Sequence, residues 1–583
     1  MNKYDLYRSG RLPLPEHTLA WNMYGQGLEN IGRQGRPESF PVPRPGPEQV
    51  LVRVDCVGLC FSDVKLIRQG GSHPKLYNRD LRRQPTRLGH ETAVTVMAVG
   101  EELRDRFRPG QRLAIQPDIY QQGKSTAYGY TVPGGLIQYH LIGPEVLETD
   151  AGACVLPIEA DVPYAAAALL EPWGCVLAAY TQRRRLTPKP GGIMWIIGHM
   201  DDPTPYICST GLDAPATLVL SDVPPAVAEM ARRTGARILE RNGLRWHEYP
   251  ALVQEVTEGR GFDDIVLLDP RAAEQVSAVA ACIARRGTLN LVGREPLDGL
   301  VQADAGRLHY DYIAFVGNCG RDIGASYGEV RNRCELRPGG TAVFIGAGGP
   351  MGQMHVQRAL EHPQGPRTVI ATEVNQSRMQ ALATRFVPLA EAQGRTLLLY
   401  NPQSSSRSLA EVVGEATNGR GADDVVVCVP LPAVMAEAAQ LMAPDGMLVF
   451  FAGVPNGTLV PLDLSQVYLH GAQYTGTSGL TLADQKKVLE RATAGELRPE
   501  RSVAAVGGMR AARAGLQALM EGRYAGKIMI FPQLEDLPLL SLQELAERYP
   551  EVGARLGPHL LWTKEAEQIL IERFWRMPEE VAV

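Results

Sequence analysis

The alternation of apolar and polar positions divides the chain into a β-rich beginning and an α/β middle. Alternating runs such as 49–59 and 112–120 are separated by turns containing Pro and Gly, which is typical of strands. Residues 161–185 predict one helix with Asp161 as its start signal, an alanine-rich body and a basic end. Beyond it, apolar strands alternate with helical segments, which predicts parallel sheets covered by helices.

The α/β pattern occurs twice. Residues 255–270 (EVTEGRGFDDIVLLDP) and 415–430 (EATNGRGADDVVVCVP) align without a gap. Each copy begins with Pro-Gly-Gly and an apolar strand, at 190–198 and 338–346, and each has a later strand that ends in an acidic residue. Convergence is the alternative, but the fold does not require the shared Gly-Arg-Gly-x-Asp-Asp, so we favour a duplicated domain.

These patterns divide the chain into five predicted segments. They are the first part of a β-rich domain (1–190), a first α/β module (191–335), a second α/β module (336–490), a returning part of the β-rich domain (491–535) and a C-terminal helical extension (536–583).

Composition narrows the classes of protein to consider. The 583 residues are 45% hydrophobic and 21% charged, as in globular proteins. The 59 Lys and Arg residues against 64 Asp and Glu residues argue against a dedicated nucleic-acid binder. The absence of a leader pattern, of long apolar runs and of regularly paired cysteines predicts no membrane association and a reducing, cytoplasmic location.

Candidate metal ligands occur in two short segments. GLCFSD (58–63) places Cys60 at a turn after a strand, and LGHETAVTV (88–96) places His90 and Glu91 before another strand. Each residue alone is more often structural. Together, however, a thiolate, an imidazole and a carboxylate suit zinc, and a catalytic zinc uses about three protein ligands and one open position.

A candidate cofactor turn lies in VFIGAGGPMGQMHVQRAL (343–360), which predicts a strand, a Gly-rich turn and a helix. Glycines let the backbone approach a pyrophosphate, and the helix N-terminus favours its charge. An acidic residue about 20 residues further on suits the ribose of NAD and repels the extra phosphate of NADP, although Arg378 keeps NADP as an alternative. A tight turn without a ligand is the other interpretation. The predicted cofactor residues are Gly346, Gly348, Gly349, Pro350, Met351, Gly352 and Glu373.

These motifs resemble the zinc-dependent medium-chain dehydrogenases, which include alcohol, sorbitol and threonine dehydrogenases. The family signature joins Gly-x-Cys-x-Ser-Asp to Gly-His-Glu, and both are present here. The resemblance implies a GroES-like β-rich catalytic domain with two tandem Rossmann-like, doubly wound parallel sheets. It also implies that Cys60 and His90 bind zinc, that Ser62 relays the alcohol proton and that Asp63 orients a ligand. The implied catalytic residues are thus Ser62, Asp63 and His90.

A third element extends the implied metal site. LLEPWGC (169–175) is similar to the Glu-Pro helix start of the polyol branch, where the glutamate approaches zinc directly or through water. The implied ligand set is therefore Cys60, His90, Glu91 and Glu171, with Cys175 as a weaker candidate. Val94 replaces a family glycine. The family's optional structural zinc needs four cysteines, and 116–140 contains none, so we expect one catalytic zinc and no structural zinc.

Within the family, the chain looks most similar to the L-sorbose-1-phosphate reductase group, through segments 72–91, 326–340 and 346–360. This similarity implies hydride transfer between NAD(H) and a secondary alcohol or ketone of a small polyol or sugar. Four arginines near the zinc segment form either a phosphate clamp or a solvated loop: Arg79, Arg82, Arg83 and Arg87. The competing functions are an amino-alcohol dehydrogenase of the threonine type and a non-catalytic nucleotide-binding scaffold.

The first α/β copy lacks the glycines of the second. Asp201 and Asp202 stand where a pyrophosphate would bind and would repel it. Since this family commonly dimerises through edge strands, we expect the first copy to mimic a second subunit, with 312–318 pairing with 472–477. The chain is then either a monomer with an internal pseudo-dimer or a homo-oligomer. An altered ligand site at Asp222 is the alternative role for this copy.

Overall fold

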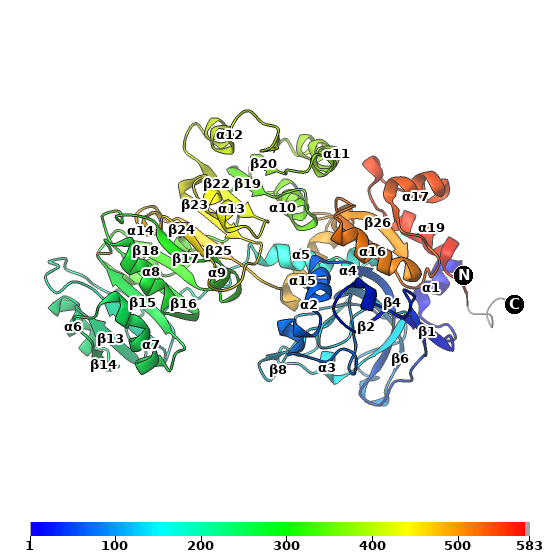
Figure 1. The fold of residues 1–583 in the computed structure, drawn as a ribbon, viewed down its shortest axis with the longest axis horizontal. Helices are drawn as coiled ribbons and strands as arrows, with labels where there is room; N and C mark the ends of the chain where they lie inside the picture. The colour runs from blue at the N-terminus through cyan, green and yellow to red at the C-terminus, as the bar shows by residue number, and fades with distance from the viewer. Residues whose placement is uncertain (1, 578–583) are drawn as a thin grey trace. The chain divides into compact units, whose positions relative to one another are not determined.

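The computed structural model of the chain describes residues 2–577, which form two compact units (Figure 1). The first unit contains both ends of the chain and Gly349–Met354, and the second contains Ala178–Gly348 and His355–Ser478. Within the described residues, no helix has the length and apolar character needed to span a bilayer.

The first unit is built on an eight-stranded sheet with the order β11-β7-β6-β4-β27-β26-β28, and β10 also pairs with β4. The strand β27, near the end of the chain, pairs antiparallel with β4 from its beginning, so distant segments share one sheet. Every residue of β4 is buried. The bounds are β4 Val50–Gly58, β6 Glu91–Val99, β7 Arg112–Ile115, β10 Tyr139–Ile142, β11 Val155–Pro157, β26 Val503–Gly508, β27 Lys527–Phe531 and β28 Leu540–Ser541.

The single helix predicted over 161–185 is wrong in extent. Two shorter helices are present, α4 (Tyr164–Ala168) and α5 (Leu170–Ala178), with Leu169 between them. Pro172 explains the break, because proline lacks an N–H donor and its ring clashes with the carbonyl four residues earlier. Asp161 does not cap a helix, since it forms ion pairs with Arg8 and Lys564 instead.

The second unit contains two six-stranded parallel sheets with the same strand order, which confirms the predicted pair of doubly wound sheets (Figure 1). The first sheet has the order β14-β13-β12-β15-β16-β18: Arg237–Glu240, Thr217–Ser221, Ile193–Ile197, Phe262–Leu268, Ile283–Val292 and Ala314–Asn318. The second has the order β21-β20-β19-β22-β23-β25: Thr396–Tyr400, Thr368–Thr372, Thr341–Ile345, Ala422–Val427, Met442–Phe450 and Gln473–Gly476.

The helices between these strands also correspond in order, except that α10 of the second copy has no counterpart between β12 and β13 of the first. In the first copy they are α6 Pro225–Arg232, α7 Tyr249–Thr257, α8 Ala273–Ala281 and α9 Ala305–Tyr310. In the second copy they are α10 Pro350–Glu361, α11 Gln376–Ala392, α12 Leu409–Ala416, α13 Pro432–Ala439 and α14 Ser465–His470.

The repeated Asp-Asp pair has the same structural role in both copies. Asp264 Oδ2 accepts a hydrogen bond of 2.8 Å from the backbone N–H of Lys189, and its Oδ1 accepts one of 3.1 Å from Arg185 Nη2. The pair thus holds the segment that leads into the first strand of the module. The equivalent contacts of the second copy are made by Asp424, Arg337 and Arg333.

The two copies pack on one another inside the second unit. The edge strands β18 and β25 are in contact, α14 packs on β18, and α9 packs on β25, so each edge meets the other copy. The hydrogen-bonded ladder lies elsewhere, between β17 (Val301–Asp304) and β24 (Leu459–Leu462), which are antiparallel. The expected neighbourhood of 312–318 and 472–477 is therefore present, but the backbone pairing is made by a different pair of strands.

Candidate functional site

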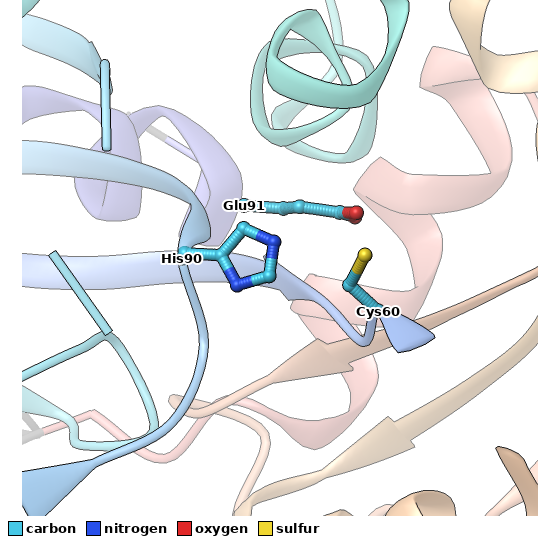
Figure 2. A group of neighbouring side chains, drawn as sticks. All are labelled: Cys60, His90 and Glu91. Atoms are coloured by element: carbon cyan, nitrogen blue, oxygen red, sulfur yellow. The ribbon is translucent and has the colours of Figure 1, made fainter. Parts of the chain in front are cut away.

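Two neighbouring strands of the first unit bring the candidate metal ligands together. Cys60 follows β4 and is the N-cap residue of α2 (Phe61–Gln69), while His90 and Glu91 lie at the start of β6. Gly58 is opposite Glu91 in the antiparallel pair, so the end of one strand meets the beginning of the other. One ligand atom from each of Cys60, His90 and Glu91 lies within 4.8 Å of the others, as Figure 2 shows.

The chemistry of this cluster fits a zinc ion. Glu91 Oε2 is buried and has no hydrogen-bond partner within residues 2–577, a state that costs about 1–3 kcal/mol when nothing compensates. Burial lowers the pKa of the His90 imidazole, but Cys60 and Asp63 outweigh it and hold that pKa well above its usual range. A half-buried thiol, a buried imidazole and a buried carboxylate that lie close together form a donor set that a divalent cation would satisfy.

Asp63 joins the two ligand segments. Its Oδ2 accepts a hydrogen bond of 2.9 Å from the backbone N–H of Cys60, and its Oδ1 accepts one of 3.2 Å from Gly89 N–H. The same Oδ1 lies 3.5 Å from His90 Nδ1. The Asp63 side chain is 1% exposed, so its acceptor capacity is spent on positioning Cys60 and His90.

Glu171 is buried near the cluster but does not belong to its close group in the part of the chain that the structure describes. Burial raises its pKa to about 7, His90 opposes the rise and Glu91 adds to it, so the three groups interact electrostatically. The Sγ of Cys175 lies 3.8 Å from Glu171 Oε1. Direct or water-mediated ligation by Glu171 stays a prediction.

Lys527 is a residue of this site that the sequence did not reveal. Its ammonium, 2% exposed, forms an ion pair with Oε1 of the fully buried Glu91, which leaves Oε2 for another partner. Burial lowers the pKa of Lys527, but Glu91 outweighs this effect and raises it. A lysine at the start of an apolar strand was the only local signal, and its partner lies on a distant segment.

Tyr130 forms an aromatic wall beside the cluster and was also missed. Its ring centroid lies 6.0 Å from that of His90 and 5.2 Å from that of His73. Burial raises the pKa of Tyr130, and the nearby Ser62 side chain opposes this rise. The Oγ of Ser62 lies 3.8 Å from Cys60 Sγ, so the predicted proton-relay hydroxyl lies at the edge of the metal cluster.

The four arginines near this site do not share a partner. Arg79 donates to Thr131 O at 3.1 Å, and Arg87 donates to Asn22 Oδ1 at 3.2 Å. Arg82 and Arg83 are exposed to solvent. This distribution favours the solvated-loop interpretation for at least the last two.

The Gly-rich turn of the second copy has the backbone that its sequence predicts. Gly346 has φ of 76°, a conformation that other residues rarely adopt. A Cβ atom on Gly348 would lie 2.2 Å from Glu373 Oε2, so any larger residue there requires the Glu373 side chain or the turn to shift. Glu373 follows β20, and its Oε1 accepts hydrogen bonds of 2.9 Å from the N–H groups of Val374 and Asn375. Pro350, Met351 and Gly352 form the first turn of α10, and Gly349 precedes it.

The corresponding edge of the first copy is lined by different side chains. A cavity of about 280 Å³ lies beyond β12 and β13, and its lining includes His199, Asp201 and Asp222. Both carboxylate oxygens of Asp222 accept a hydrogen bond from Gly243 N–H, at 3.0 and 3.1 Å. Asp202 accepts from Tyr206 OH at 2.7 Å. This edge therefore presents acidic side chains where the second copy presents glycines.

Comparison with known proteins gives two family matches. Residues 46–148 match the family described as "Alcohol dehydrogenase GroES-like domain", and residues 350–494 match "Zinc-binding dehydrogenase". The L-sorbose 1-phosphate reductase of Klebsiella pneumoniae is 24% identical, with 95% of this chain and 97% of that protein covered. The mannitol-1-phosphate 5-dehydrogenase of Aliivibrio fischeri is 22% identical, with coverage of 92% and 94%.

Two further comparisons concern a shorter sequence match and a solved structure. The sorbitol dehydrogenase of Bacillus subtilis is 27% identical, with 48% of this chain and 76% of that protein covered. Among solved structures, the 2R,3R-butanediol dehydrogenase of Bacillus subtilis is 15% identical, with a TM-score of 0.49 and coverage of 88% of this chain and 99% of that chain.

Proposed function

Because the chain belongs to the zinc-dependent medium-chain dehydrogenases, oxidoreductases of alcohols and polyols, we propose that it transfers a hydride between NAD(H) and a secondary alcohol or ketone of a sugar or polyol phosphate. The observation that carries this proposal is the convergence of Cys60, His90 and Glu91, together with the buried and unpaired Oε2 of Glu91.

The chain's own residues divide the work in this proposal. A bound zinc ion supplies Lewis-acid polarisation of the substrate oxygen, and a bound nicotinamide supplies or accepts the hydride. Cys60, His90, Glu91 and Glu171 would hold one zinc ion, with Asp63 orienting the first two. Ser62 would relay the proton of the substrate hydroxyl toward solvent, and Tyr130 lies beside it.

Support for a phosphorylated substrate comes from the two relatives that are similar over more than nine-tenths of both chains, whose names are those of enzymes of sugar or polyol phosphates. Support for NAD over NADP comes from Glu373, whose buried carboxylate would repel a 2′-phosphate.

Within the second unit, the two α/β copies cover each other's edge strands, and this supports an internal pseudo-dimer. Light scattering would distinguish such a monomer from a homo-oligomer.

The decisive experiment is NADH and NADPH oxidation on metal-analysed protein, with ketoses and ketose phosphates as matched substrates. We expect the Cys60→Ala variant to lose bound zinc and turnover while it still binds NADH. Cys319→Ala is the matched control, because Cys319 is exposed. Turnover that persists in zinc-free Cys60→Ala protein contradicts the assignment, and activity on an amino alcohol alone would replace the substrate class.

A further inference from the structure

The C-terminal helix α19 (Lys564–Phe574) places a carboxylate inside the first unit, at the start of α4. Glu567 is 0% exposed. Its Oε1 accepts a hydrogen bond of 2.5 Å from Tyr164 N–H, and its Oε2 accepts one of 3.0 Å from Ala165 N–H. These are the first two N–H groups of α4, and the first turn of a helix has no acceptor of its own for them.

The sequence around α4 offers no substitute for this contact. The N-cap residue is Pro163, whose side chain has no acceptor atom, whereas helices usually begin with Ser, Thr, Asp or Asn. All five residues of α4 are buried against β4, β6 and β7, so water does not replace the missing acceptor. A negative charge at this end also interacts favourably with the helix dipole.

The start of α4 determines where Glu171 lies. After α4 the chain passes through Leu169 directly into α5, and Glu171 is the second residue of that helix. A shift at Tyr164 is therefore transmitted over less than two helical turns to the Glu171 carboxylate, which interacts electrostatically with His90 and Glu91.

The same C-terminal segment also reaches the strand that carries Lys527. Trp562 Nε1 donates to Glu567 Oε2 at 3.2 Å, and the Trp562 ring lies 6.0 Å from that of Phe531, the last residue of β27. Lys527, the partner of Glu91, is the first residue of β27. The segment thus contacts α4, which leads into the helix of Glu171, and β27, which carries Lys527.

We propose that Glu567 is a positioning residue for the candidate metal centre: by capping α4 with its carboxylate, it fixes the approach of Glu171 to Cys60, His90 and Glu91. The proposal rests on the proposed function, because it gives Glu171 a place in the metal site. An apolar side chain would fill the same space without the cost of burying an acid, so the hydrogen bonds account for the presence of a carboxylate here.

The surroundings of Glu567 show the cost of burying its negative charge. Burial raises its pKa to about 7, and the hydrogen bonds from Ala165, Tyr164 and Trp562 oppose the rise. Glu567 also interacts electrostatically with Tyr4, Cys56 and Arg112.

The test replaces Glu567 by Gln in the full chain, with Glu565→Gln on the same helix as the control, because Glu565 is exposed. Cobalt loaded in place of zinc reports ligand geometry through its visible spectrum, and chelator competition reports affinity. We expect Glu567→Gln to alter the spectrum and to weaken metal affinity by about 10-fold or more, the lower end of what such outer partners contribute, with kcat reduced and KM nearly unchanged.

Coupling shows whether the effect passes through Glu171. In a Glu171→Gln background, adding Glu567→Gln should change metal affinity less than about twofold, since residues that act as a unit are non-additive. A lower melting temperature with an unchanged spectrum, affinity and kcat overturns the proposal. If Glu567→Gln fails to fold, Trp562→Phe, which removes one donor to the carboxylate, serves the same comparison. An inactive wild type would contradict the proposed function, while the cobalt spectrum would still decide the role of Glu567.

Discussion

The two α/β modules of the second unit share their strand order and their Arg–Asp clamp, but they differ at the edge where a dinucleotide binds. The second copy has Gly346, Gly348 and Glu373 there, while the first has Met200 and Asp201 at positions equivalent to Gly348 and Gly349. The clamp holds the fold in both copies. The glycines of the turn and the helix α10, which has no counterpart in the first copy, therefore distinguish the candidate cofactor site from the corresponding edge of the first module.

The first copy has a structural role that does not depend on binding a ligand: it covers the edge strand of the second copy. An uncovered edge strand exposes unpaired backbone groups and invites aggregation. Here α14 of the second copy covers β18, and α9 of the first copy covers β25. Arg184 donates to Ile313 O and to Gly476 O, each at 3.1 Å, and so joins the two copies. The role of covering an edge strand constrains the residues that pack between the two copies. It does not constrain the residues at the position of the Gly-rich turn.

The largest expected effect comes from giving the second copy the residue of the first. In Gly348→Met, the new Cβ would lie 2.2 Å from Glu373 Oε2, so the carboxylate or the turn must move. We expect NADH affinity to fall by about 100-fold, equivalent to about 2.7 kcal/mol. Fluorescence titration with NADH measures it. Met200→Gly in the first copy should leave the affinity unchanged, and equal losses in both variants would contradict the difference between the modules.

A smaller effect is expected from the acidic residue that ends the second strand of each module. Glu373→Gln keeps an acceptor but removes the charge, so NADPH should become a better ligand relative to NADH by about tenfold, or about 1.4 kcal/mol. Asp222→Asn is the matched change in the first copy, where the carboxylate already accepts from Gly243 N–H, and it should alter neither affinity. A change of preference in Asp222→Asn would instead favour a ligand site in the first copy.

The residues discussed above also show how much of the structure could be predicted from the sequence. Short sequence patterns located the residues whose positions depend on nearby parts of the chain. Cys60 and His90 lie at strand ends that the apolar pattern predicts, and Gly346 has the positive φ expected of its turn. The helix over 161–185 failed because Pro172 breaks it. Lys527 and Glu567 could not be found, since their partners Glu91 and Tyr164 come from distant parts of the chain and only tertiary packing brings them together.

The Asp-Asp motif provides the smallest and most discriminating test. In the sequence, the repeated motif indicates only a duplicated domain. Its role in holding the segment before the first strand follows from the contacts of Asp264 and Asp424 in the structure. Burial raises the pKa of Asp264 to about 6, against the opposing effect of Arg185, and burial also raises the pKa of Asp424. The folded state therefore gains most stability from Asp264 when this acid is protonated, below its usual pKa, and that gain is lost as pH rises through about 6.

Asp264→Asn removes that dependence on pH. We expect the substitution to destabilise the protein by about 1 kcal/mol more at pH 5 than at pH 7, because only the wild-type acid gains from binding a proton on folding. Denaturant unfolding at the two pH values measures this difference, and Asp424→Asn should change in the same direction if the clamps are equivalent. A destabilisation that shrinks at pH 5 would mean that the ion pair with Arg185 outweighs burial, and opposite signs in the two variants would show that the modules share their geometry but not their electrostatics.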